Sequence, residues 1–258
     1  MRSVNVIKVG GGIVEDASSL SVLLKDFACL EGLKVLVHGG GRSATKIATA
    51  LGIESRMVNG RRITDEATLD VVTMVYGGLV NKRVVAGLQS HGLCALGLTG
   101  ADLDLIRSHK RPVADVDYGW VGDVERVDGA ALARLLEQDI VPVVAPLTHD
   151  GMGHMLNTNA DSIANEVACS LVPFFDVRLT FCFEKRGVLR DAECDESVIP
   201  QIDEPTFRRL TAEGVIAGGM IPKLDNAFAA LSRGVREVVI TRADHLDGEG
   251  GTRISHSF

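Results

Sequence analysis

Short apolar runs alternate with segments whose apolar residues recur every three or four positions. Residues 4–9 form an apolar run that ends in three glycines, and residues 34–38 form a second run that also ends in three glycines. The segments that follow them, 16–31 and 43–51, carry apolar side chains at helical spacing. The order strand, helix, strand, helix at this spacing predicts a parallel sheet covered by helices.

The rest of the chain continues this pattern after one irregular stretch. Residues 55–64 contain Asn59-Gly60 between short arms, which is typical of a hairpin. A long helix is expected over 65–90, and it has more apolar positions than one surface helix needs, so we expect part of it to meet another subunit. The elements expected after it are strands at 94–98, 103–107, 140–147, 176–183 and 236–240, a hairpin over 116–126, and helices at 129–138, 159–171, 204–213 and 221–233.

Composition and charge narrow the class of protein. The 258 residues are 46% hydrophobic, which is enough for one large domain or two closely packed halves. A net charge of −7 without any run of Lys or Arg argues against nucleic-acid binding. No apolar stretch approaches the ~18 residues of a membrane span, and the N-terminal pattern is that of a strand rather than of a signal peptide. The five cysteines form no CxxC motif, so we expect reduced thiols in a cytoplasmic protein.

Glycines at the carboxyl ends of the first two strands form the first candidate site. Residues 10–12 follow one strand and residues 39–41 the next. Backbone N–H groups at such positions can bind an anion together with the positive end of the following helix, so two clusters in one sheet favour a phosphate or carboxylate site over tight turns alone. A P-loop string is absent. The GxGxxG-like string at 39–44 lacks the acidic residue of a dinucleotide fold, and the HGGG string has no GxSxG nucleophile elbow.

Two lysines lie beside glycines where local stability does not explain them. Lys8 is inside an apolar strand, and Lys223 falls in the first turn of a helix, where a cation opposes the helix dipole. Both are better explained by an anionic ligand. In the segment Asn157-Thr158-Asn159-Ala160-Asp161, by contrast, either asparagine can be an N-cap and Asp161 a favourable first-turn acid. The seven histidines are scattered, so we expect no metal site formed by the protein.

Taken together, these segments resemble the N-acetylglutamate kinases, a branch of the amino-acid kinase family. The resemblance covers nearly the whole chain and is carried in order by VIKVGGG, VLVHGGGRSATKIA, VNGRRITDEATLDVV, NTNADSIAN, GGMIPKLDNA and GTRI. It implies an α/β three-layer sandwich with a central, mostly parallel sheet. Residues 1–173 would then bind the acylated amino acid and residues 174–258 ATP. The implied reaction is phosphorylation of the side-chain carboxylate of an N-acylglutamate, a step of arginine biosynthesis.

The resemblance also assigns roles to particular residues. Lys8 and Lys223 match the lysines that act on the transition state, and Asp161 matches the acid that orients them. The positions that hold the amino-acid substrate are Gly40, Gly41, Arg62 and Asn157. The nucleotide-contacting positions are Gly10, Gly11, Glu184, Lys185, Arg186, Gly187, Gly219 and Lys223. The chain departs from the family pattern at Glu184, which replaces an Asp, and at the added pair Lys185-Arg186.

The chemistry of this reaction agrees with the candidate residues. A glutamate side chain has a pKa of about 4.3 and is already an anion at neutral pH, so no general base is needed. The difficulty is that two anions meet, and two lysines, glycine N–H groups and Mg²⁺ carried with ATP can neutralise them. The hairpin at 55–64 is expected to act as a lid that encloses the acyl chain together with the glycines 39–41. Arg62 lies on this lid, away from the glycine loops beside Lys8 and Lys223, and is expected to bind a substrate carboxylate.

Some alternatives stay open at this stage. The acyl group can be acetyl or succinyl. The chain can instead phosphorylate another acceptor of the family, such as glutamate, aspartate, carbamate or UMP, or it can be an inactive regulator that binds an amino acid or a nucleotide. Retention of Lys8, Asp161 and Lys223 argues against the inactive regulator. We expect a homodimer that contacts its partner through the helix over 65–90.

Overall fold

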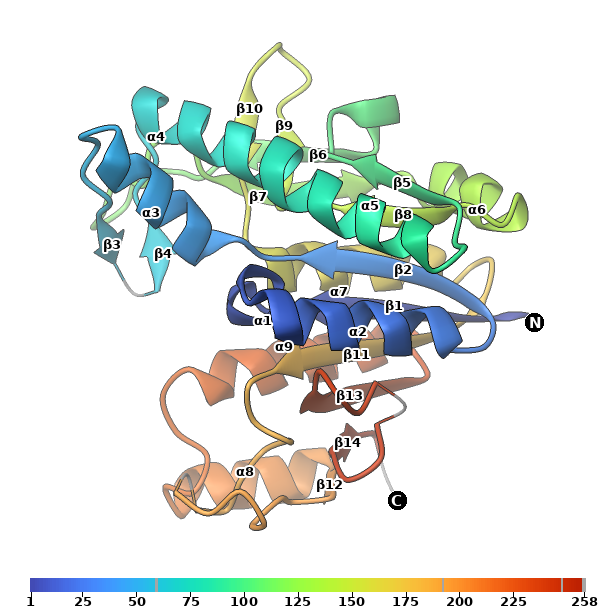
Figure 1. Ribbon diagram of the computed structural model, residues 1–258. Coiled ribbons are helices and arrows are strands. Elements are labelled where there is room, and N and C mark those ends of the chain that lie inside the picture. The colour runs from blue at the N-terminus through green and yellow to red at the C-terminus, as the bar shows by residue number, and fades with distance from the viewer. Residues whose placement is uncertain (59, 192, 247, 257–258) are drawn as a thin grey trace.

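The computed structural model describes residues 1–58, 60–191, 193–246 and 248–256, and its centre is an eight-stranded sheet (Figure 1). The strands lie in the order β12-β14-β13-β11-β1-β2-β8-β5. The strands from β13 to β5 are parallel, and β12 and β14 run antiparallel to them. Their bounds are β1 (Ser3–Val9), β2 (Leu33–His38), β5 (Ala95–Leu98), β8 (Val141–Val144), β11 (Asp176–Phe183), β12 (Gln201–Ile202), β13 (Glu237–Arg242) and β14 (Thr252–Ile254).

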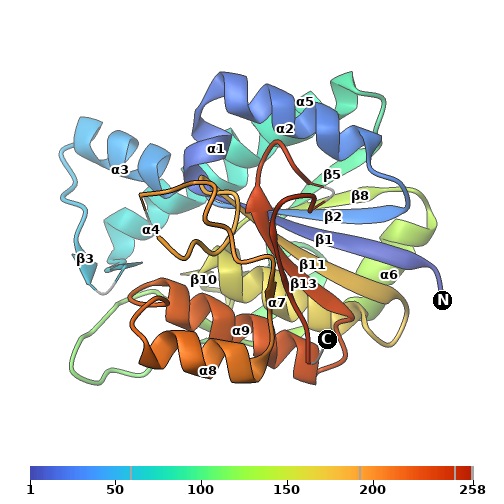
Figure 2. The same ribbon diagram turned by 90° about the horizontal axis from the view of Figure 1, so that it is seen from below.

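Helices cover both faces of this sheet, as Figure 2 shows. One face is packed by α1 (Gly11–Glu15), α2 (Ala17–Cys29), α3 (Gly41–Ala50), α4 (Glu66–Val72), the π-helix η1 (Thr73–Val80) and α5 (Asn81–Ser90). The other is packed by α6 (Gly129–Glu137), α7 (Ala160–Leu171), α8 (Glu204–Ala212) and α9 (Met220–Ser232). The expected three-layer α/β sandwich is therefore confirmed. No helix formed by the described residues has both the length and the apolar character to cross a bilayer.

The alternation of side chains along β1 decides which layer receives each residue. Val4 and Val6 pack into the core with α7 and α9, whereas Ile7 and Val9 pack into the opposite core. Because successive side chains of a strand point to opposite faces, Lys8 belongs to the same face as Val4 and Val6. β1 pairs with β2 on one side and with β11 on the other, so the sheet is continuous between the two expected halves of the chain.

Two smaller sheets lie beside the main one. A four-stranded sheet has the order β10-β9-β6-β7, and β3 pairs with β4 as the expected hairpin. Asn59, which the sequence analysis used for this hairpin, lies outside the described residues. The bounds are β3 (Met57–Val58), β4 (Arg61–Arg62), β6 (Ile106–Lys110), β7 (Gly122–Val127), β9 (Leu147–His149) and β10 (Met155–Asn157).

Some expected elements differ from the structure. The hairpin over 116–126 is wrong, because β7 pairs antiparallel with β6 and the preceding residues form a loop. The strand expected over 103–107 begins only at Ile106, after the 3₁₀ turn η2 (Asp102–Asp104). The run 140–147 is divided between β8 and β9, which belong to different sheets. The helix over 65–90 is continuous but contains the π segment, and the one over 16–31 starts after an N-cap at Asp16.

Candidate active site

The two glycine loops pack backbone against backbone at the carboxyl ends of β1 and β2. The Gly39 N–H donates to the Val9 carbonyl at 3.0 Å. A Cβ added at Gly39 would lie 3.0 Å from the backbone nitrogen of Gly11, and one added at Gly11 would lie 3.4 Å from those of Gly40 and Gly41. Side chains at these positions would force the loops apart, which explains the glycines. The two loops therefore form one wall with helix starts behind it.

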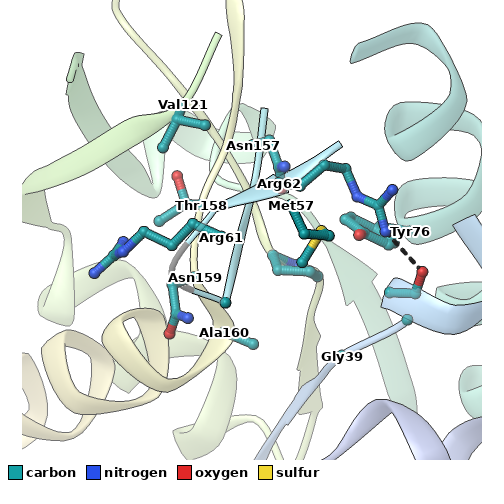
Figure 3. Close-up of a pocket in the computed structure, with 14 residues that line it drawn as sticks. Gly39, Met57, Arg61, Arg62, Tyr76, Val121, Asn157, Thr158, Asn159 and Ala160 are labelled. Atoms are coloured by element: carbon teal, nitrogen blue, oxygen red, sulfur yellow. Dashed lines mark hydrogen bonds between the residues drawn. The ribbon is translucent and has the colours of Figure 1, made fainter. Parts of the chain in front are cut away.

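Among the cavities that adjoin this wall, two share Gly41. The first, about 210 Å³, lies under the hairpin (Figure 3) and is lined by Gly39, Gly40, Gly41, Met57, Gly60, Arg61, Arg62, Tyr76, Val121, Pro146, Asn157, Thr158, Asn159 and Ala160. The second, about 500 Å³, is lined by Lys8, Gly10, Gly11, Gly12, Ile13, Gly41, Arg42, Asp161, Phe183, Glu184, Lys185, Gly187, Met220 and Lys223. We call them the acid cavity and the nucleotide cavity after the ligands expected for each half.

Lys8, Asp161 and Lys223 come together in the nucleotide cavity from β1, α7 and α9. Lys8 Nζ lies 2.6 Å from Asp161 Oδ1, and Lys223 Nζ lies 3.5 Å above the centre of the Phe183 ring. Burial lowers the pKa of Lys223 and Lys8 lowers it further, while Asp161 opposes both effects. Lys8 is thus paired with the carboxylate, whereas Lys223 only feels its attraction, and the three side chains together carry a net positive charge at the cavity.

The start of α7 separates the roles of the two asparagines. Asn159 is the N-cap, because its side-chain oxygen accepts from the backbone nitrogens of Asp161 and Ser162 at 2.8 and 3.1 Å. Asn157 ends β10 and donates through Nδ2 to Thr64 Oγ1 at 3.0 Å. Asn157 is therefore not a cap and lines the acid cavity, whereas Asp161 is held in the first turn and aimed at Lys8.

Arg62 is buried against the start of α3. It donates through Nη1 to Ser55 Oγ at 2.8 Å, and through Nη2 to the Gly41 carbonyl at 2.9 Å and Thr45 Oγ1 at 2.8 Å. The hairpin folds onto α3 and brings the guanidinium to Gly41, and the four residues expected to hold the amino-acid substrate, Gly40, Gly41, Arg62 and Asn157, line the acid cavity together (Figure 3). Tyr76 packs on the other side of this loop, where a Cβ at Gly40 would lie 2.9 Å from its ring.

The charged residues after β11 are engaged with other charged side chains. Glu184 pairs with Arg42 at 2.9 Å across the nucleotide cavity, which joins the loop after β11 to α3. Lys185 Nζ pairs with Asp195 at 2.8 Å, and Arg186 with Glu196 at 3.4 Å. Gly10, Gly11, Glu184, Lys185 and Gly187 line the nucleotide cavity, and Gly219 is the N-cap residue of α9; Arg186 and Gly219 are not among its lining residues.

Sequence reasoning missed a buried support for the second glycine loop. His38 Nδ1 lies 2.7 Å from the Gly39 carbonyl, so Nδ1 carries the proton and donates it. His38 Nε2 then accepts from Asn81 Nδ2 at 3.1 Å, and that Nδ2 also donates to the Val143 carbonyl at 2.9 Å. Burial lowers the pKa of His38 to about 4, against the opposing effect of its bond to Gly39. The HGGG string contained His38, but nothing local indicated Asn81 as its partner.

Phe183 was also not assigned a role from the sequence. Its ring lies under both ammonium groups, 5.0 Å from Lys8 Nζ and 3.5 Å from Lys223 Nζ. The alternation along β11 puts it on the same sheet face as Phe181, and the two rings stack. Among the described residues, no three His, Cys, Asp or Glu side chains gather as a metal-binding group.

The chain is similar to known proteins over almost all of its length. The model of the amino acid kinase family matches residues 3–242. A Bacteroides fragilis protein named acetylglutamate kinase is 67% identical over 253 residues, 98% of this chain and 97% of its own, and a Methanopyrus kandleri protein of the same name is 40% identical, covering 95% and 98%. The solved structure of smu.665 from Streptococcus mutans has a TM-score of 0.81 at 27% identity, covering 98% of this chain and 99% of its own. Carbamate kinase from Giardia lamblia, at 14% identity and a TM-score of 0.68, covering 98% of both chains, shares the fold.

Proposed function

The chain belongs to the amino acid kinase family, and we propose that it transfers the γ-phosphoryl group of ATP to the side-chain carboxylate of an N-acylated glutamate. Relatives that are 63–67% identical over nearly the full chain carry the name acetylglutamate kinase, which makes N-acetyl-L-glutamate the reference acceptor and arginine biosynthesis the pathway. The observation that carries the proposal is the convergence of Lys8, Asp161 and Lys223 next to the point where the two cavities meet. An inactive regulator would have no use for this arrangement.

The reaction forms one bond and breaks another, and it needs no general base. An oxygen of the glutamate side-chain carboxylate attacks the γ-phosphorus, and the bond from that phosphorus to the β,γ-bridging oxygen breaks. ADP leaves with the bridging electrons, and the product is an acyl phosphate. Since the attacking carboxylate is already ionised, no proton has to be removed, and catalysis consists of positioning and charge neutralisation.

The residues of the nucleotide cavity suit that task. Lys8 and Lys223 can approach the transferring phosphoryl group from two sides, and Asp161 keeps Lys8 in place at 2.6 Å. Gly11 can offer its backbone N–H group at the same cavity, whereas the Gly10 N–H already donates to the Cys182 carbonyl at 3.1 Å. Glu184, Lys185 and Gly187 form the cavity wall. Mg²⁺ enters with ATP as part of the substrate, because Asp161 and Glu184, two carboxylates of this cavity, are each paired with a cation. The ion supplies further neutralisation of the phosphates.

The acid cavity holds the second substrate. Gly40 and Gly41 lie at the start of α3, Asn157 lies at the end of β10, and Arg62 is poised between them. A guanidinium can bind the main-chain carboxylate of the acylglutamate through two N–H donors. The hairpin β3–β4 covers this cavity and excludes water from the easily hydrolysed acyl phosphate.

We further propose that the enzyme is a cytoplasmic homodimer. The π-helix η1 exposes Met74 and Leu79 by 55% and 37%, and the edge strand β5 exposes Leu96 by 38%. A second copy would cover these apolar side chains and the free edge of the sheet. The five cysteines are all unpaired, which suits a reducing compartment. Light scattering should give twice the 27.5 kDa chain mass, and the mass of a single chain at micromolar concentration would contradict the dimer.

The activity is tested by ADP release in a coupled assay. We expect turnover with an N-acylated glutamate and little with free glutamate, whose ammonium would face Arg62. Aspartate, carbamate and UMP should be inactive. Equal rates with free and acylated glutamate, or turnover only with one of the other acceptors, would refute the assignment.

A further inference from the structure

The acid cavity contains a second arginine at the end opposite Arg62. Arg61 and Arg62 are adjacent residues of β4, so their side chains leave the strand in opposite directions. Figure 3 shows the two guanidinium groups on opposite sides of the cavity, Arg62 towards Tyr76 and Arg61 towards Asn159. Both residues line the same space.

Arg61 differs from its neighbouring arginines Arg62 and Arg111 in its contacts. Arg62 has three acceptors, and Arg111 is bound by Asp123 through both ends of its fork. Within the part of the chain that the structure describes, no hydrogen bond or ion pair reaches the Arg61 side chain. It is nevertheless half-buried, and burial lowers its pKa, with a further lowering from Arg111 that Asp123 opposes. A partly desolvated guanidinium without an acceptor is poorly explained by stability and well explained by an anionic ligand.

The charges of an acetylated substrate leave this arginine unused. N-acetylglutamate has two carboxylates. The side-chain carboxylate must reach the cavity that holds Lys8 and Lys223, and the main-chain carboxylate suits Arg62. Nothing anionic then remains for Arg61. The phosphates of ATP are not available either, because Arg61 does not line the nucleotide cavity.

We propose that Arg61 selects an acyl group that ends in a carboxylate, as a succinyl group does. This rests on the proposed kinase activity and specifies its substrate. The acyl chain would extend from the glutamate nitrogen past Met57 and Val121, which also line the cavity, and its terminal carboxylate would accept two hydrogen bonds from the Arg61 fork. Arg61 is then a specificity-determining residue that does not touch the reacting atoms.

The test compares N-succinylglutamate with N-acetylglutamate in four proteins: the natural chain, Arg61→Leu, Arg61→Lys and Arg56→Leu. Arg56 is exposed in the segment that leads into the same hairpin and does not line the acid cavity, so its variant removes the same charge outside the site. We expect the natural enzyme to favour the succinyl substrate by about 10–100-fold in kcat/KM, the range typical of hydrogen bonds to charged groups. Arg61→Leu should lose that preference through a higher KM for the succinyl form alone. Arg61→Lys should be intermediate, and Arg56→Leu should match the natural enzyme.

The outcomes separate this proposal from the kinase activity itself. Equal use of both acyl forms by the natural enzyme would overturn the role of Arg61 and leave the kinase intact. An equal loss on both forms in Arg61→Leu would also overturn it, because Arg61 would then bind the main-chain carboxylate or support the hairpin. If no acylglutamate were turned over, the proposed function would fail. In that case the dissociation constants of the two acylglutamates, measured by calorimetry, would still test the selectivity. The proposed role of Arg61 fails if Arg61→Leu binds both compounds with the same affinities as the natural chain.

Discussion

Removing the Lys223 ammonium should slow phosphoryl transfer while leaving substrate binding nearly unchanged. Lys8 and Asp161 form a pair at 2.6 Å that is neutral as a unit, so the net positive charge of the three side chains comes from Lys223. The Phe183 ring 3.5 Å below its Nζ supports the ammonium and holds it at the cavity wall. Lys223→Ala removes this charge and leaves the pair of Lys8 and Asp161 intact.

The expected loss follows from the preorganisation of Lys223. Removing one fixed group that stabilises a developing charge lowers kcat by about 10²–10³, or roughly 3–4 kcal/mol. Because Lys223 is only partly buried, water can replace some of its effect, and we expect the lower end, about 10² in kcat. The KM values for ATP and acylglutamate should change by less than about threefold, since an interaction made in the transition state lowers kcat and kcat/KM together.

The pH profile gives an independent measurement of the same residue. Burial and Lys8 lower the pKa of Lys223 from its ordinary value of 10.5. The cation is present below that lowered pKa and is lost as the pH rises through it. The basic limb of the kcat profile should therefore fall below pH 10.5, and Lys223→Arg, which stays protonated, should move that limb to higher pH.

ADP release at saturating substrates, together with the thermal midpoint of each variant, is the assay for Lys223. Lys25→Ala, on the exposed side of α2, is the matched control and should leave kcat unchanged. A kcat within threefold of the natural value in Lys223→Ala, with an unmoved basic limb, would refute the reasoning and make Lys223 a surface residue.

Three further variants test neighbouring parts of the site. Asp161→Asn should lower kcat by about 10²-fold with small KM changes, because the Asp161 carboxylate orients the lysines in the transition state. A change confined to KM would exclude that role. Arg62→Lys should raise KM for the acylglutamate at least tenfold and leave KM for ATP nearly constant, because one ammonium cannot replace a fork, and equal effects on both substrates would contradict it. His38 is neutral when folded, with a pKa of about 4 against 6.5 unfolded, so folding stability should fall as the pH drops below 6.5. When the pH is lowered from 7 to 5, the free energy of unfolding measured in urea should fall by about 2 kcal/mol less in His38→Asn than in the natural chain. Equal decreases in the two proteins would argue against a buried neutral imidazole.

The parts of this site that the sequence predicted depend on short-range patterns. Lys8 follows from the alternation of one strand, and the glycine loops follow from their position directly after apolar runs. These patterns lie within about ten residues, so the sequence alone is sufficient. Lys223 is singled out by its place in a first helical turn, where a cation is unfavourable. The role of Asp161 needed the family resemblance, because an N-terminal turn alone explains an acid there equally well.

The parts that the sequence did not predict depend on pairing between distant segments. β7 has a mixed polar pattern that becomes a strand only because β6 lies beside it, and the short strands β12 and β14 have too few residues to show a period. The bond from Asn81 to His38 spans 43 residues, and Asn81 is the residue directly after the π-helix. Such contacts depend on how the helical layers and the sheets pack together. A short stretch of sequence contains no information about that packing.

The contacts of Arg62 also change the interpretation of the hairpin as a lid. A lid that moves independently would need few bonds to the body, but Arg62 joins the hairpin to Gly41 and Thr45 of α3. Thr64, just beyond the hairpin, exchanges backbone hydrogen bonds with Tyr118 and Trp120 of the neighbouring loop. The hairpin is therefore already docked on the wall that binds the acid. A substrate carboxylate that accepts hydrogen bonds from Arg62 must compete with the Gly41 carbonyl and the Thr45 hydroxyl. Substrate binding and the position of the glycine loop are therefore coupled through the Arg62 guanidinium.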